Sequence, residues 1–82
     1  MTQMQARVTV KLKAGVLDPQ GEAIERALHS LGFTSASNVR VAKVVELQLE
    51  GSDRANVEHA LKVMADQLLA NPVIEDYRVE LL

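Results

Sequence analysis

The sequence predicts a small α+β domain: an antiparallel sheet with two helices on one face, in the order strand, helix, long or split strand, helix, strand. Segments near both ends alternate apolar and polar residues, which is typical of half-buried strands. Two internal segments repeat apolar residues every three or four positions, as helices with one buried side do. The 82 residues fit one domain, and we expect residues 1–82 to form it.

The first strand and the first helix have clear local signals. Residues 7–13 alternate in polarity and form the predicted strand. Asp18–Pro19 indicates a helix start, because aspartate is a preferred N-cap and proline suits the first helical position. Gly32 is expected to end the helix in a left-handed conformation, with Phe33 folding back as a hydrophobic contact. Gly21 lies inside the first turn, and we interpret it as the mark of a close approach by another backbone.

The middle segment, Val39–Leu49, is about twice the usual strand length of about 5–6 residues. Adjacent Val44 and Val45 break its alternation, and Lys43 lies on the otherwise apolar face. We therefore interpret it as two strand segments joined by a bend or bulge near Ala42–Val44. Its length and nearly two-faced apolar character also predict a contribution to self-association.

The second helix is expected to be capped by Ser52 or Asp53, after Gly51 closes the preceding segment. Asn71–Pro72 is expected to stop this helix, because a residue before proline avoids the helical conformation. A final alternating strand follows over residues 76–81. The predicted apolar stripe of the helix comprises Val57, Ala60, Leu61, Met64 and Leu68, widened by Ala65 and Leu69.

The composition excludes several classes of function. The chain has no cysteine for a disulfide or a thiolate metal site, and only Phe33 and Tyr77 are aromatic. The net charge is −2 with both signs mixed along the chain, so neither a basic stripe nor a base-stacking platform for nucleic acid is present. No apolar run approaches the roughly 18–20 residues that span a bilayer, and Met1–Gln5 lacks the order of a signal peptide. We expect a cytoplasmic chain that binds neither nucleic acid nor membrane.

Candidate chemistry is equally sparse. His29 and His59 are interpreted as solvated or helix-edge residues, since their spacing does not support a metal site. Glu75–Asp76 would point to opposite faces of a strand, which does not suit a general acid/base pair. Arg40 and Lys43 are a basic pair that could meet an anion or an acidic partner, or simply form an exposed strand face. The sequence therefore predicts no catalytic, cofactor-binding or metal-binding residue, and a thin core that favours oligomerisation.

Three blocks of sequence carry a family resemblance, in the order and at the chain length of the family. They are Val16–Gly21 with Ala27–Phe33, then Val39–Lys43 with Glu46–Leu47, and finally Leu68–Tyr77. Together they resemble the PurS family, the small subunit of bacterial-type phosphoribosylformylglycinamidine (FGAM) synthase. The family often has glycine where this chain has Ala42, a difference that bears on the expected bend.

The resemblance implies a non-catalytic accessory subunit of a ligase complex in de novo purine biosynthesis. That complex uses ATP and glutamine to convert formylglycinamide ribonucleotide (FGAR) into FGAM. A glutaminase subunit releases ammonia, and a large synthetase subunit uses it with ATP and Mg, so no cofactor is expected in this chain. The chain would form a homodimer, possibly pairing into a tetramer, and would bridge these two partners to support ammonia transfer. Expected partner contacts are polar residues at or beside the matching blocks: Asp18, Gln20, Arg40, Lys43, Asn71, Asp76 and Arg78.

Each of these contact residues also has a local explanation as a cap, helix-start residue, strand face or helix stop. A different class of function also stays open, a small-ligand-binding regulatory dimer, because α+β units of this order often sense amino acids at dimer interfaces. Tight binding of an amino acid or nucleotide in calorimetry would favour that alternative. A nucleic-acid-binding module of the same topology is disfavoured by the charge and the missing aromatic residues.

Overall fold

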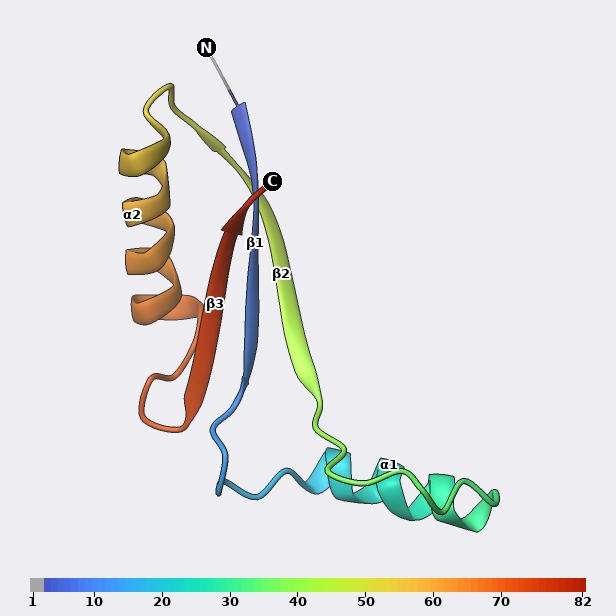
Figure 1. The fold of residues 1–82 in the computed structure, drawn as a ribbon. Coiled ribbons are helices and arrows are strands. Elements are labelled where there is room, and N and C mark those ends of the chain that lie inside the picture. Colours follow the sequence, from blue (N-terminus) through green and yellow to red (C-terminus); the bar gives the residue numbers. More distant parts are fainter. Residues whose placement is uncertain (1–2) are drawn as a thin grey trace.

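The computed structural model describes residues 3–82 and contains one three-stranded antiparallel sheet, two α-helices and a π-helical turn (Figure 1). The strand order in the sheet is β2-β1-β3. This confirms the predicted α+β class with an antiparallel sheet and two helices. The elements are β1 (Gln3–Leu12), α1 (Pro19–Ser30), β2 (Ala42–Glu50), α2 (Arg54–Met64), η1 (Ala65–Leu69) and β3 (Glu75–Leu81).

One face of the sheet is apolar because alternate side chains of all three strands point to the same side. Val8 of β1, for example, lies between Val45 of β2 and Val79 of β3. α2 and η1 cover this face and insert Leu61, which is fully buried. The core is thin, as predicted: its largest fully buried side chains are only Leu61, Val8 and Val10.

α2 begins at Asp53, whose carboxylate accepts the backbone N–H groups of Ala55 and Asn56. Its buried residues recur every fourth position and form a narrow stripe that continues into η1: Val57, Leu61 and Ala65. α2 lies over β1 and β3 and touches the sheet along one line only. Three other residues of the predicted stripe are therefore exposed: Ala60, Met64 and Leu68. The helical segment ends at Leu69, ahead of Asn71–Pro72 as predicted.

β2 corrects the interpretation of the middle segment. The predicted bend near Ala42–Val44 is wrong, because β2 pairs with β1 in unbroken register from Lys11↔Ala42 to Gln3↔Glu50. The expected long strand is instead one continuous strand that starts at Ala42. Val39–Val41 stays outside the sheet because its backbone bonds to side chains of the α1 region. Val44 breaks the alternation simply by lying on the outer face, where it is 54% exposed.

α1 differs most from the expectation. Only α2 covers the sheet, whereas α1 projects away from its lower end (Figure 1). α1 lies beyond the ends of the strands and does not reach the part of the apolar face over β2 that α2 leaves partly uncovered (Figure 1). Its apolar side chains are therefore largely exposed, at 44% for Ile24 and 72% for Leu31.

The end of α1 follows the predicted stop. Gly32 has a φ of 96°, and the N–H groups of Gly32 and Phe33 donate to the carbonyls of His29 and Leu28 (3.0 and 2.9 Å), which is a Schellman motif. The Phe33 side chain remains 60% exposed, so the predicted hydrophobic contact does not bury it.

The shape of the chain is extended, with principal extents of 52 × 25 × 15 Å. Its radius of gyration is 16.4 Å, against about 12 Å for a compact domain of this length. Its accessible surface is 5813 Å², about a fifth more than the roughly 4,900 Å² expected for a compact monomer of this mass. Among residues 3–82, no helix combines the length and the apolar character that crossing a membrane requires.

A candidate partner-contact site at the α1 end of the sheet

The three strands meet near the start of α1, and most of the predicted contact residues gather there. Lys11, near the end of β1, lies between Ala42 of β2 and Asp76 of β3. Two shallow depressions of about 400 and 240 Å³ share Lys11 at this end. Arg40 and Asp76 line the first depression. The second is lined by further predicted residues: Asp18, Gln20 and Lys43.

Asp18 is built into the fold and is only 4% exposed. Its Oδ1 accepts the N–H of Gly21 and so caps α1, while its Oδ2 accepts the N–H of Val41 (both 2.9 Å). The bond from Val41, and after it the bond from Gly21, hold the pKa of the Asp18 carboxyl below its usual range. The positive charge of nearby Arg40 lowers this pKa further, whereas burial of the carboxyl raises it. Asp18 is therefore ionised at neutral pH and turned toward its own backbone.

The lowered pKa gives a pH prediction. A carboxylate whose pKa is lowered by folding stabilises the native state fully above its unfolded pKa of about 4, and this contribution is lost as the pH falls through the lowered value. Asp18→Asn should therefore be less stable than the wild type at pH 7, and the difference should shrink below pH 4. Urea unfolding at a series of pH values measures this difference, which would stay constant if the Asp18 charge contributed nothing.

Arg40 and Lys43 also bond to the backbone of their own chain. Arg40 Nη2 donates to the carbonyls of Lys13 (2.9 Å) and Val16 (2.8 Å) in the connection between β1 and α1. Lys43 Nζ donates to the carbonyl of Leu69 (3.1 Å) at the end of η1. This contact explains the charge on the apolar face of β2, because a cation is favourable at a helix C-terminus.

The other predicted residues divide between a turn and the open surface. Asn71 builds the turn before β3: its Oδ1 accepts the N–H of Val73, and its own N–H donates to Glu75 Oε1. Gln20 and Asp76 are exposed and make no side-chain hydrogen bond within residues 3–82. Arg78 lies on the outer face of β3, 3.6 Å from the exposed carboxylate of Glu80. Gln20, Asp76 and Arg78 are therefore the predicted contact residues whose exposed side chains are not bonded to the backbone of the described residues.

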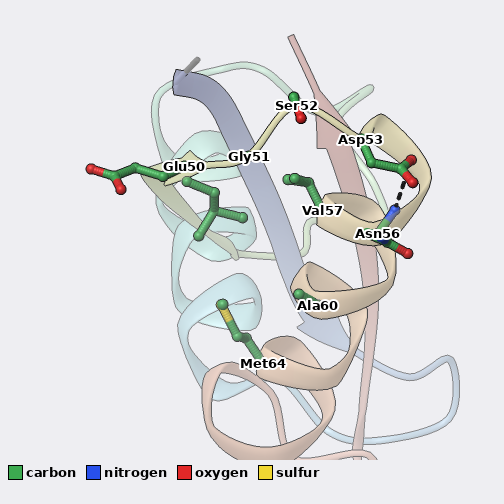
Figure 2. Close-up of a pocket in the computed structure, with 9 residues that line it drawn as sticks. Glu50, Gly51, Ser52, Asp53, Asn56, Val57, Ala60 and Met64 are labelled. Atoms are coloured by element: carbon green, nitrogen blue, oxygen red, sulfur yellow. Dashed lines mark hydrogen bonds between the residues drawn. The ribbon is translucent and has the colours of Figure 1, made fainter. Parts of the chain in front are cut away.

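A second feature, at the opposite end of the sheet, was missed by sequence reasoning. An apolar groove of about 360 Å³ lies between the end of β2 and α2. Figure 2 shows Val57, Ala60 and Met64 of α2 on one side of it, facing the Glu50–Ser52 backbone. The sequence did contain a signal for this groove, because the predicted apolar stripe of α2 is wider than one line of contact with a sheet requires.

These features define a class of protein: a small α+β assembly subunit with more surface than its own fold can bury. Residues 5–82 match the family model described as PurS, phosphoribosylformylglycinamidine (FGAM) synthase. The PurS subunit of FGAM synthase from Bacillus subtilis is 49% identical over 76 residues, which cover 93% of this chain and 89% of that protein. The PurS subunit from Methanocaldococcus jannaschii is 42% identical over 76 residues, covering 93% and 92%.

Solved structures agree with the sequence matches. B. subtilis PurS superposes with a TM-score of 0.85 at 47% identity, over 96% of this chain and 98% of that chain. A chain in the structure of PurLQS from Thermotoga maritima superposes with a TM-score of 0.91 at 30% identity, over 100% of both chains. The chain belongs to the PurS family and is a subunit of FGAM synthase in purine biosynthesis.

Proposed function

We propose that this chain connects the glutaminase subunit and the large synthetase subunit of FGAM synthase and supports ammonia transfer between them, without contributing a catalytic residue. The observation that carries the proposal is the match over its whole length to a chain of the T. maritima PurLQS structure. The polar side chains at the α1 end are consistent with this role, because most of them hold the backbone and none forms an acid/base or nucleophilic set. A place in nucleotide biosynthesis also supports a cytoplasmic location.

We assign direct contact with the partner subunits to Gln20, Asp76 and Arg78, whose side chains are exposed at and beside the α1 end of the sheet. The remaining predicted residues act indirectly, because their polar atoms bond to the backbone of this chain: Asp18, Arg40, Lys43 and Asn71.

We also infer that the chain forms a homodimer through the part of the apolar sheet face that β2 forms and α2 leaves only partly covered. Val45, Leu47 and Leu49 of β2 are only partly buried there, next to Ala60 and Met64 of the groove. The excess surface of about 900 Å² is close to the roughly 800 Å² that each partner buries in an interface of standard size. The exposed apolar residues of α1 offer a second surface by which dimers would pair into a tetramer.

Co-purification tests the connecting role. A tagged form of this chain, mixed with the glutaminase and synthetase subunits in the presence of glutamine and ADP, should elute with both in one complex. Asp76→Lys should weaken that complex about tenfold or more, because reversing a charge that faces a complementary partner is unfavourable. Asp66→Lys, the same charge reversal at another exposed aspartate, on η1, is the matched control. Elution of the tagged chain alone, or equal effects of the two variants, would contradict the proposal.

A further inference from the structure

α1 leaves the sheet as an arm, and a small cluster of contacts ties its first turns to the segment that leads into β2. Asp18 Oδ2 accepts the N–H of Val41 (2.9 Å). About two turns further on, Glu25 Oε1 accepts the N–H of Val39 (3.2 Å). The segment 39–41 is therefore attached to α1 at two points, although it belongs to neither the helix nor the sheet.

Arg40, between these two points, ties the same segment to the chain that enters α1. Its Nη2 donates to the carbonyls of Lys13 and Val16. Residues before and after α1 are thus joined across the base of the helix, about where it leaves the sheet (Figure 1). Two sets of bonds therefore link the segment 39–41 to the start of α1, one to Asp18 and Glu25 and the other from Arg40 to the chain before the helix.

Gly21 shows how closely the parts approach. It is buried in the first turn of α1, and a Cβ at this position would overlap the carbonyl oxygen of Val39. This explains the glycine that local helix preference disfavours, and it is the close backbone approach that the sequence indicated. Backbone packed this tightly leaves α1 little freedom to swing on its connections.

We propose that this junction is a rigid elbow, in which Asp18 and Arg40 are positioning residues that hold α1 at a fixed direction relative to the sheet. The arm then presents its exposed apolar side chains already oriented, so contact with another chain needs no ordering of α1 at that moment. This inference concerns the free subunit and stands whether or not the chain connects the two other subunits of the complex.

The substitution Asp18→Asn tests the role of Asp18 in the elbow separately from its role as the cap of α1. Asp18 uses two carboxylate oxygens for two amides, Gly21 and Val41, whereas asparagine has one acceptor oxygen and is an equally good N-cap. Asp53 is the matched control, because its Oδ1 alone accepts both amides at the start of α2. Asp53→Asn should therefore keep every bond of its cap.

Two measurements on the full chain test the elbow. In hydrogen exchange, Asp18→Asn should lower the protection of one of the two amides, Val41 or Gly21, by about ten- to a hundredfold. The chain has no cysteine, so spin labels can be placed at Arg26→Cys on α1 and Gln48→Cys on the outer face of β2. Electron–electron distance measurements on labelled chain diluted with unlabelled chain should give one narrow distance distribution in the wild type and in Asp53→Asn. The distribution should broaden in Asp18→Asn and in Arg40→Gln.

A narrow distribution in both Asp18→Asn and Arg40→Gln would overturn the elbow, since α1 would then be held by other contacts. Equal broadening in Asp53→Asn would overturn it as well, because the effect would then reflect general loosening of the fold. Unchanged protection of both amides in Asp18→Asn would show that the Asp18 bonds do not restrain the segment.

Discussion

Replacing Leu47 with lysine should dissociate the proposed homodimer into monomers. Leu47 lies opposite Ala6 on the apolar face of the sheet, and α2 leaves it only partly covered. A lysine there would bury an unpaired charge in the proposed dimer interface, so we expect the dimer dissociation constant to rise by about a hundredfold or more. Sedimentation equilibrium over a range of concentrations measures the change.

Gln48→Lys is the control for this experiment, because the neighbouring side chain points to the outer face of the same strand. Leu47 also packs against the core, so Met64→Lys, on the exposed rim of the groove, serves as a second variant that spares the fold. Circular dichroism verifies folding in each case. Variants that stay folded and keep the wild-type mass would refute dimerisation through this face.

Replacing Leu61 with alanine should remove a large share of the stability of the chain. Leu61 is the largest fully buried side chain, and a leucine-to-alanine change in a core costs about 2–5 kcal/mol. A chain of this length has only about 4–12 kcal/mol in total. Urea unfolding at one fixed protein concentration measures the loss, because the stability of the proposed dimer would depend on concentration.

Val63→Ala on the same helix is the control, since Val63 is 39% exposed. Its cost should stay within about 1 kcal/mol, because little cavity forms at an exposed site. Equal costs for the two variants would show that the thin core under α2 does not carry the stability of the fold.

The elements that local signals define were predictable from the sequence. Asp18–Pro19 starts α1 and Gly32 ends it, because capping depends on a few adjacent residues. Gly21 was also informative, since a glycine in a helix needs a reason beyond local preference. Residues 7–12 belong to β1. This strand was predictable because its alternation of apolar and polar residues is visible within one segment.

The predictions that were wrong or incomplete concern features that depend on contacts between residues distant in the sequence. The strand start at Ala42 is set by bonds from Asp18 and Glu25 to the preceding segment, which no local pattern reveals. Periodicity shows that α1 has an apolar side, but it does not show whether that side meets the sheet or another chain. Lys43 seemed to break an apolar face, and only the structure shows its ammonium at the carbonyl of Leu69.

The candidate site was predictable as a neighbourhood but not residue by residue. Asp18 and Asp76 come from opposite halves of the chain, and both lie at the α1 end of the sheet. Sequence alone could not distinguish a buried cap from an exposed carboxylate, because both are aspartates beside a chain reversal. Burial and hydrogen bonding separate Asp18, which shapes the backbone, from Asp76, which faces outward.

In the proposed role, this chain supports ammonia transfer between other subunits without carrying out a reaction itself. The most direct test measures FGAM formation by the glutaminase and synthetase subunits, with and without this chain, using either glutamine or ammonium as the nitrogen source. We expect that omission abolishes glutamine-dependent synthesis, that ammonium-dependent synthesis by the synthetase persists, and that the chain alone forms no product. Equal glutamine-dependent rates with and without the chain would contradict it.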